Sequence, residues 1–324
     1  MNITSEKSSK KSEHNLNPQF DFANITQDEA LSILKEYNIA LTYSEALKIQ
    51  ELLNRAPTLS ECILWGIQGS EHCSYKSSKN HLKKFVTDGP NVILGAKEDA
   101  GVIRICKDET GVGFSLVISH ESHNHPSQVV PFEGAATGIG GNIRDVTCMG
   151  AEVIALADGL RFGDFNNPKT HWIYDGVVSG LASYGNAIGV PNITGDAYFH
   201  SGFKDNCLVT VTTLGSLKDD EIIHSYAPKD ANNYALILVG KPTDNSGFGG
   251  ASFASVDLEE EDSDANKGAV QEPNAFLGRM MMKISKALFK KLKAKNLLDK
   301  VGFKDLGAGG IACASVEIAE VAGY

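Results

Sequence analysis

The apolar segment 92–118 contains three stretches rich in β-branched residues, VILG, GVIRIC and VGFSLVIS, and it runs directly into the polar nonapeptide SHESHNHPS. Such stretches are typical of β-strands. The glycine-dense segment 134–149, which follows the nonapeptide, has the pattern of a helix. Most of what the sequence says about function depends on the nonapeptide, residues 119–127, with its three histidines and one glutamate.

The chain divides into four parts by composition and periodicity. The polar start, residues 1–23, has the character of a disordered tail. Apolar residues at helical spacing predict a helical hairpin over 24–56, with Thr42 as an N-cap. We expect a main domain over 57–225 and the beginning of a second domain over 226–324.

The second domain has few strand candidates. CLVTVTTLG (207–215) and YALILVG (234–240) flank a polar, turn-rich segment, which places a domain boundary near residue 225. A long helix candidate follows at 274–294. A sheet that incomplete would leave apolar edges unpaired. We therefore expect the sequence to be the front part of a longer protein.

Composition disfavours several classes of protein. The formal net charge of −10 argues against a general nucleic-acid binder, which normally carries a basic face. The six cysteines form no CxxC pair, and their scatter suits a reducing cytosol better than a disulfide framework. The polar start lacks the apolar core of a signal peptide, and no apolar run approaches the ~20 residues that span a bilayer. We expect a soluble, cytoplasmic protein that binds neither nucleic acid nor membrane.

A zinc site is one hypothesis for the nonapeptide. His120, His123 and His125 have the spacing HxxHxH, and zinc favours imidazole nitrogen. Against this, the HExxH helix of metalloproteases is absent. On a strand, side-chain alternation would put Glu121 together with His123 and His125 and would turn His120 to the opposite face. Zinc is therefore the weaker hypothesis.

A magnesium and phosphate site fits the same region better. Glu121 and Asp145 are carboxylates of the kind that Mg²⁺ takes together with substrate phosphates, and Arg144 can bind phosphate through two hydrogen bonds. Glycines, which let backbone N–H groups approach anionic oxygen, stand at positions 134, 138, 140 and 141. No GxxxxGK[ST] P-loop is present, so ATP would have to bind on another fold.

A purely structural explanation remains, in which the glycines serve helix packing and the histidines are ordinary surface residues. Two further polar clusters argue against it. GSEHCSYK at 69–76 adds a histidine and an aromatic hydroxyl, and DLGAGG at 305–310 places a carboxylate before a glycine turn that opens a helix. Three such clusters in one chain favour a functional site.

Five motifs occur in one order: GSEHCSYKSSK, ESHNHPSQVVPFEGAATGIGGNIRDVTCMGA, ASFAS, VQEPNAF and DLGAGG. Together they closely resemble the large synthetase subunit family of phosphoribosylformylglycinamidine synthase, the PurL type. The resemblance runs from about residue 40 to the last residue. It implies the aminoimidazole ribonucleotide synthetase-like fold, of class α/β (α+β), in which an N-terminal domain with an open mixed sheet is followed by a second α/β domain.

The resemblance also implies a reaction. Family members are ligases that convert formylglycinamide ribonucleotide, ATP and glutamine-derived ammonia into formylglycinamidine ribonucleotide, ADP and phosphate, a step of de novo purine synthesis. The implied cofactors are ATP and Mg²⁺. A separate glutaminase subunit supplies the ammonia in small-form members, which also use a small bridging subunit. Superfamily members often pair through the first domain's sheet, so a homodimer is also expected.

The same resemblance assigns roles to individual residues of this chain. The catalytic positions are His72 and, as proton acceptor, His123. Contacts with the nucleotide are implied for Tyr75 and for the position of Ser119. The magnesium ligands are Glu121, Asp145 and Asp305. The substrate-binding positions are Ser122, Asn124, His125, Arg144 and Gln271.

The chain departs from the family pattern in three places. Family members commonly have a lysine that contacts ATP phosphates where this chain has Ser119. The family's DGIHGA turn reads NSGFGGA at 245–251 and lacks the histidine, and the segment between Gln271 and Asp305 is longer than expected. Two alternatives follow. One is another ATP-dependent amide- or acyl-phosphate-forming enzyme of the superfamily, and the other is a non-catalytic half that holds a nucleotide or serves as an interaction module.

Overall fold

The computed structural model describes residues 16–255 and 267–324. The chain forms two compact units, Met1–Gly69 and Ser70–Tyr324. Residues 1–15 of the expected tail lie outside the described residues. The rest of that tail is folded, because Gln19 pairs with Thr58 in an isolated bridge and Phe22 is fully buried. The first unit therefore begins earlier than its composition indicates.

The first unit is a small helical bundle. Its helices are α1 (Gln27–Glu36), α2 (Tyr43–Leu53) and α3 (Leu59–Gln68). Each helix starts with a capping box, in which a threonine and the glutamate three residues later bond each other's backbone N–H groups. The capping threonines are Thr26, Thr42 and Thr58. Helices α1 and α2 are those expected over 24–56, and α3 extends the unit to Gly69.

The second unit is built on a six-stranded mixed sheet with the order β1-β2-β3-β6-β4-β5. The strands are β1 (Val92–Leu94), β2 (Gly101–Lys107), β3 (Gly113–Ser122), β4 (Glu152–Phe162), β5 (Asn192–Phe199) and β6 (Leu208–Lys218). Neighbours are antiparallel except β4 and β5, which run parallel and are connected by helix α8 (Pro168–Ile188). The strands predicted within 92–118 and at 207–215 are confirmed.

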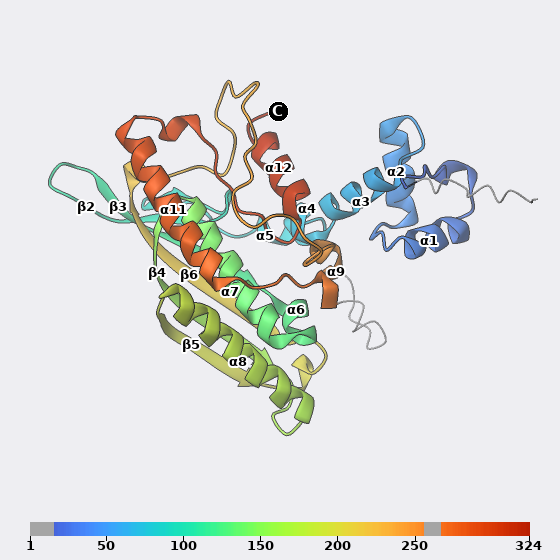
Figure 1. The fold of residues 1–324 in the computed structure, drawn as a ribbon, viewed down its shortest axis with the longest axis horizontal. Helices are drawn as coiled ribbons and strands as arrows, with labels where there is room; N and C mark the ends of the chain where they lie inside the picture. The colour runs from blue at the N-terminus through green and yellow to red at the C-terminus, as the bar shows by residue number, and fades with distance from the viewer. Residues whose placement is uncertain (1–15, 256–266) are drawn as a thin grey trace, which may run out of the picture. The chain divides into compact units, whose positions relative to one another are not determined.

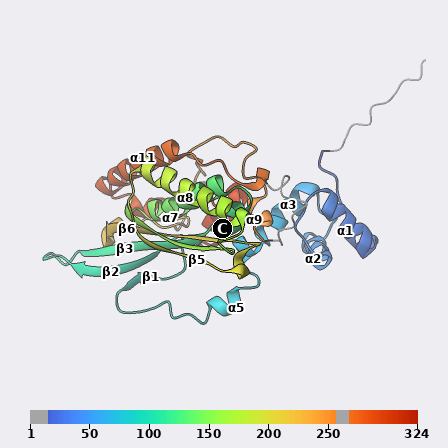
Figure 2. The same cartoon turned by 90° about the horizontal axis from the view of Figure 1, so that it is seen from below.

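Helices α7 (Pro131–Cys148) and α8 cover one face of this sheet, as Figures 1 and 2 show. Gly180 lets them approach closely, because a β-carbon there would lie 2.3 Å from the carbonyl oxygen of Phe132. Apolar residues of α7 and α8 join those of β4 and β6 in the main core. Helix α11 (Ala275–Ala294) packs against both helices (Figure 1). The position of Asp145 on α7 is thus fixed by the core.

Within residues 70–255 and 267–324, the remaining helices are α4 (Glu71–Ser74), α5 (Lys79–Leu82), α6 (Asn124–Val129), α9 (Gly250–Phe253) and α12 (Gly310–Glu320). The described residues also form short 3₁₀ turns, namely η1 (Phe22–Asn24), η2 (Ser201–Phe203), η3 (Asp219–Glu221), η5 (Lys267–Ala269) and η6 (Leu298–Lys300). In the part of the chain that the structure describes, every helix is too short or too polar to cross a bilayer.

The strand predicted at 234–240 is absent, so this prediction was wrong. The segment has no regular secondary structure, and Leu236 and Ile237 are 73% and 80% exposed. A strand needs a neighbour for its backbone N–H and C=O groups. None of the strands within residues 16–255 and 267–324 pairs with this segment. Apolar composition alone does not make a strand without such a partner.

Candidate functional site

Three aspartates converge at the C-terminal end of α7. Asp99 lies just before β2, Asp145 lies in the last turn of α7, and Asp305 lies in the loop before α12. One carboxylate oxygen of each lies within 4.8 Å of the others. One cation can therefore contact all three. The sequence motifs contain Asp145 and Asp305. Asp99 was missed, because it stands in the segment KEDAG, which matches none of those motifs.

Asp99 has one buried carboxylate oxygen without a partner. Its side chain is 4% exposed, and its Oδ2 atom is buried without a hydrogen-bond partner. Its Oδ1 atom is paired with Lys304 Nζ, which also lies 2.9 Å from Glu317 Oε2. Leaving a buried carboxylate oxygen unpaired costs free energy. A divalent cation between Asp99, Asp145 and Asp305 would satisfy it, and three carboxylates are a ligand set that suits Mg²⁺.

Glu121 stands at the end of β3 beside these aspartates. Burial of its carboxyl group, followed by the charge of Asp305, raises the pKa of Glu121 to about 7, although Arg144 opposes the shift. Its side chain also hydrogen-bonds with Asp145. The residue is exposed at the end of the strand, so water screens part of the repulsion between the carboxylates. We call Asp99, Glu121, Asp145 and Asp305 the acidic cluster.

Three carboxyl groups of the acidic cluster, those of Asp99, Glu121 and Asp145, hold protons more strongly than isolated carboxylates do. Burial, then the charges of Asp305 and Glu121, raises the pKa of Asp145 well above its usual range. Burial raises the pKa of Asp99 to about 6, although the neighbouring Lys304 opposes this. A divalent cation that binds here must displace these protons. The affinity of the cluster for a cation should therefore rise with pH.

Ser119 lies in a different setting from the one that the resemblance implied. It is 5% exposed. Its hydroxyl donates to Asp145 Oδ2 at 2.9 Å and accepts from Asn142 Nδ2 at 2.8 Å. Both hydrogen bonds are made inside the protein. This geometry favours a role in orienting Asp145 over direct contact with a nucleotide.

The three histidines of the nonapeptide do not share one site. Strand β3 ends at Ser122 and α6 begins at Asn124. His120 therefore lies on the strand, where its Nδ1 atom is 2.7 Å from Thr212 Oγ1. His125 lies on α6, with its ring edge-on to Phe253. Within the described ranges, the only group with metal-ligand spacing is the three aspartates, so the zinc hypothesis has no geometric support.

His123 is enclosed at the start of α6. Its Nδ1 atom contacts the carbonyl oxygen of Gly134, and its backbone N–H donates to Val209 at 2.8 Å. Gly138 leaves room for it, because a β-carbon there would lie 2.9 Å from His123 Cβ. Burial lowers the pKa of His123 to about 4. The ring is therefore neutral at pH 7, and with Nδ1–H facing a carbonyl, Nε2 is the nitrogen that can accept a proton.

The SEHCSYK segment approaches the same region from α4. His72 Nδ1 lies 2.9 Å from Ser255 Oγ, and burial followed by the nearby His125 lowers the pKa of His72. Tyr75 takes a left-handed backbone conformation with φ of 51°. Burial, together with charges that include Glu121, raises the pKa of Tyr75. The charge state of His72 is therefore linked to that of His125, and the charge state of Tyr75 to that of Glu121.

Arg144 and Gln271 lie on or next to α7. The Nε atom of Arg144 is 3.6 Å from Asp305 Oδ2, so its charge offsets part of the acidic cluster. The backbone carbonyl of Gln271 accepts from Thr137 Oγ1 at 3.0 Å, which links the chain at Gln271 to the middle of α7. Arg144 and the backbone at Gln271 are thus both held by the helix that carries Asp145.

Ser122 and Asn124 flank His123 at the turn from β3 into α6. Ser122 is exposed at the end of the strand. The Oδ1 atom of Asn124 accepts from the backbone N–H of Val209 at 2.9 Å. This bond fixes the turn, so Asn124 shapes the site in addition to any contact that it makes with a ligand.

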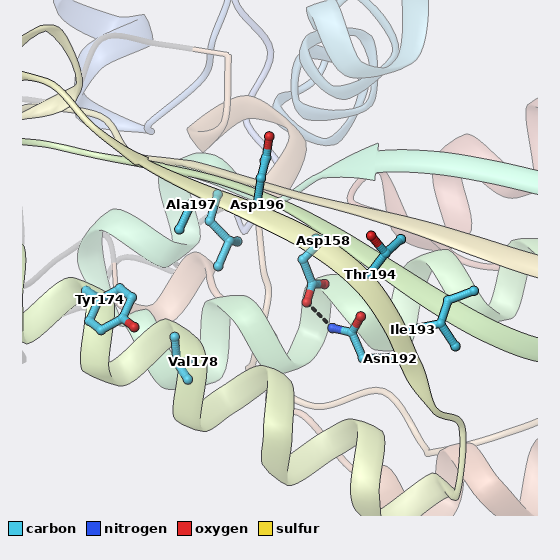
Figure 3. A pocket seen from close by; sticks show the side chains of 10 residues that line it. Asp158, Tyr174, Val178, Asn192, Ile193, Thr194, Asp196 and Ala197 are labelled. Atoms are coloured by element: carbon cyan, nitrogen blue, oxygen red, sulfur yellow. Dashed lines mark hydrogen bonds between the residues drawn. The ribbon is translucent and has the colours of Figure 1, made fainter.

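A hollow of about 490 Å³ lies between β4, β5 and α8 (Figure 3). Asp158, Tyr174 and Asn192 are among its lining residues, and Asp158 hydrogen-bonds with Asn192. Its lining contains none of the residues that the motifs assigned. It also lacks a cationic side chain for phosphate. We therefore place the candidate site at the acidic cluster.

Three family models match the chain. The N-terminal domain of AIR synthase related proteins matches residues 97–217, and the C-terminal domain of the same proteins matches 233–324. The formylglycinamide ribonucleotide amidotransferase linker domain matches 31–76. Together these models cover most of the described sequence.

Curated relatives give the decisive match. The phosphoribosylformylglycinamidine synthase subunit PurL of Methanothrix thermoacetophila is 50% identical over 93% of this chain. The chain belongs to the PurL family. The PurL subunit of Caulobacter vibrioides is 43% identical over 82% of the chain. The chain spans 39% and 34% of the lengths of these two PurL relatives.

Solved PurL structures confirm the fold class. Thermotoga maritima PurL complexed with FGAR matches with a TM-score of 0.66 and 32% identity, over 85% of this chain and 41% of that chain. Thermotoga maritima PurL complexed with ATP matches with a TM-score of 0.64 and 28% identity, over 85% of this chain and 39% of that chain. The expected open mixed sheet in an AIR synthase-like domain is thus confirmed.

Proposed function

We propose that this chain is part of a ligase that converts formylglycinamide ribonucleotide, ammonia and ATP into formylglycinamidine ribonucleotide, ADP and phosphate in de novo purine synthesis. Solved relatives described as complexes with FGAR and with ATP support this proposal. The observation that carries it is the acidic cluster, in which carboxylates from four separate segments meet beside the cations Arg144 and Lys304.

The acidic cluster would hold Mg²⁺ for ATP. The buried, unpartnered Oδ2 atom of Asp99 fits a cation, as do the raised pKa values of Glu121 and Asp145. When bound, the ion supplies positive charge to the phosphate oxygens of ATP. Lys304 stays paired with Asp99 and Glu317 and limits the negative charge that the cluster carries before the cation binds.

The proposed chemistry needs an activated amide, because an amide carbon is a poor electrophile. ATP phosphorylates the amide oxygen to give an iminophosphate, ammonia attacks the carbon, and phosphate leaves. The attacking ammonia must lose a proton, which the neutral Nε2 atom of His123 accepts. His72, the second proposed catalytic residue, acts beside His123 and is oriented through its contact with Ser255.

Substrate binding falls to the residues around His123. Arg144 supplies the cation and the paired N–H donors that suit a phosphate dianion. Ser122 and His125 offer further polar groups on the two sides of the turn. The backbone of Gln271, a further proposed substrate-binding residue, is hydrogen-bonded to Thr137 of α7. Tyr75 is proposed to contact the nucleotide, and the effect of the Glu121 charge on its pKa supports this.

Ser119→Ala is expected to lower activity without unfolding the protein. The substitution removes the hydroxyl that donates to Asp145 Oδ2, and losing a group that orients a metal ligand typically costs about 10–100-fold in metal affinity or activity. The measurement is the Mg²⁺ concentration that gives half the maximal rate of ATP turnover. Ser115→Ala is the matched control, because Ser115 is also buried on β3 but bonds Asp219. Equal effects of the two substitutions would contradict the orienting role.

Mg²⁺ is expected to stabilise the protein more at about pH 8 than at about pH 5.5. The raised pKa values of Asp99 and Glu121 mean that the native state binds protons that the unfolded chain has released above about pH 4. The stability from these groups is therefore fully present below the unfolded pKa and is lost as pH rises through about 6 to 7. The thermal midpoint with Mg²⁺ minus that with chelator measures the effect. If the thermal midpoint gained with Mg²⁺ became smaller as pH rises, the result would contradict competition between protons and the cation at the acidic cluster.

The proposed function is tested by ATP turnover in the full-length protein with Mg²⁺ and ammonium. ADP release that depends on formylglycinamide ribonucleotide is the expected result. ATP turnover that does not depend on this substrate would instead support the second candidate, another enzyme of the superfamily. The missing histidine in the 245–251 turn favours that candidate. ATP binding without any turnover would support the non-catalytic alternative.

A glutaminase subunit and a small bridging subunit are the proposed protein partners, supported by a solved relative described as PurLQS from Thermotoga maritima, 28% identical over 86% of this chain. We also place the protein in the cytoplasm, which fits its six free cysteines.

A second copy is proposed to cover the open face of the sheet. This face carries exposed apolar side chains, namely Ile103, Phe114, Ile118 and Tyr198, and contiguous apolar patches mark interaction surfaces. Ile118→Glu is therefore expected to convert a dimer to a monomer in light scattering, while Leu52→Glu on α2, also exposed, leaves the dimer intact. A wild-type protein that is already monomeric would contradict pairing between copies.

A further inference from the structure

Two cysteines outside the proposed catalytic groups lie against each other. Cys73 lies on α4 and Cys313 lies in the first turn of α12. Each thiol shifts the pKa of the other. A β-carbon on Gly309 would lie 2.8 Å from Cys73 Sγ and 3.1 Å from Cys313 Sγ. Both sulfurs thus face one small space, which the missing side chain of Gly309 leaves open.

The two thiols differ in reactivity. Cys73 is partly accessible, whereas Cys313 is buried. The adjacent Cys313 side chain, opposed by burial, lowers the pKa of Cys73 to about 7. The adjacent Cys73 side chain, followed by burial and by Glu317, raises the pKa of Cys313. Cys73 is therefore the thiolate that a solute reaches first, and Cys313 is held behind it as a resolving thiol.

We propose that Cys73 and Cys313 form a reversible disulfide with a low-molecular-weight organic disulfide as the oxidant, and that this bond slows the reaction at the acidic cluster. The Cys73 thiolate attacks one sulfur of the oxidant and releases the other half as a thiolate, leaving a mixed disulfide. Cys313 loses its proton and attacks Cys73 Sγ, and the second half of the oxidant leaves as a thiol. Two protein thiols are oxidised and one organic disulfide is reduced to two thiols.

The disulfide would tie together two segments that carry proposed site residues. His72 adjoins Cys73 on α4, and Asp305 lies in the loop that leads into α12. Oxidation also removes the S–H group of Cys313 that donates to Glu317 Oε1 at 3.2 Å. Glu317 contacts Lys304, the partner of Asp99, so the bond alters the surroundings of the acidic cluster. The effect on rate rests on the proposed function, whereas formation of the bond does not.

The test treats the reduced full-length protein with oxidised glutathione, blocks the remaining thiols by alkylation, and maps peptides without reduction. A peptide pair joined through Cys73 and Cys313 is the expected product, and dithiothreitol should reverse it. Cys313→Ser should stop at the mixed disulfide on Cys73. Cys106→Ser is the matched control, because Cys106 is an exposed thiol and its loss should leave the Cys73–Cys313 pair unchanged.

Activity provides the second readout. Substrate-dependent ADP release should fall in proportion to the fraction of molecules joined through Cys73 and Cys313, and should return on reduction. Mapping that finds only mixed disulfides in the wild-type protein would overturn the pairing. Full turnover in the joined form would overturn the effect on rate. Reduced protein with no turnover at all would count against the proposed function instead, since peptide mapping decides the pairing by itself.

Discussion

Asp145→Asn is expected to abolish magnesium-dependent turnover in the full-length protein while the fold stays intact. Asparagine keeps the shape of the side chain and can still accept the hydrogen bond from Ser119, but it removes the negative charge that faces Asp99 and Asp305. We expect kcat to fall at least about 10²-fold, the range for losing one preorganised electrostatic contact. Steady-state ADP release across a Mg²⁺ titration measures it.

Stability separates this effect from simple unfolding. Removing one of several crowded, buried carboxylates relieves repulsion, so the variant without Mg²⁺ should be at least as stable as the wild type at neutral pH. Asp158→Asn is the matched control, because burial also raises the pKa of Asp158 but its partner is Asn192, at the hollow in Figure 3. Wild-type turnover in Asp145→Asn would remove the acidic cluster from the mechanism.

His123→Ala is expected to have the second large effect. Loss of a positioned proton acceptor typically costs about 10²–10⁴-fold in rate, and we expect the change in kcat with little change in KM. The enclosed ring also makes a structural contact through Nδ1 with Gly134, so alanine leaves that carbonyl unpaired. The measurement is pre-steady-state and steady-state ADP release at saturating ATP and substrate.

Two further variants resolve the role of His123. His123→Asn keeps an N–H donor near the Nδ1 position and removes Nε2, so it should lose the rate but keep the thermal midpoint. His120→Ala is the matched control, because His120 is a nearby histidine on β3 whose side chain contacts Thr212 of β6. If His123→Asn turned over at the wild-type rate while His123→Ala did not, the histidine would serve structure and proton transfer would belong elsewhere.

Sequence patterns predicted those elements whose signal is local. The N-cap at Thr42 and the β-branched run before residue 118 predicted α2 and the strands up to β3. The segment 234–240 has the same apolar composition but forms no strand, because pairing depends on a neighbour that composition does not reveal. Helix α3 joins the first unit through contacts between residues distant in sequence, such as the bridge from Gln19 to Thr58.

The site was predictable where motifs carry it and not where the fold assembles it. Glu121, Asp145 and Asp305 could be assigned from their motifs, and their proximity could not be derived from spacing alone. Asp99 has no motif here, and only its burial and unpartnered Oδ2 atom bring it to attention. The nucleotide contact that the resemblance implies at position 119 stays a prediction, and motifs did not show that the small side chain of Ser119 is buried and hydrogen-bonded to Asp145.

Locating the bound cation tests most directly whether the acidic cluster is the magnesium site. Crystals of the full-length protein with Mn²⁺ in place of Mg²⁺ and a non-hydrolysable ATP analogue would give an anomalous signal at the metal position. The expected result is a peak in contact with Asp145 and Asp305, with the Oδ2 atom of Asp99 turned toward it. A nucleotide bound with its metal away from all three aspartates would contradict a magnesium site at the acidic cluster.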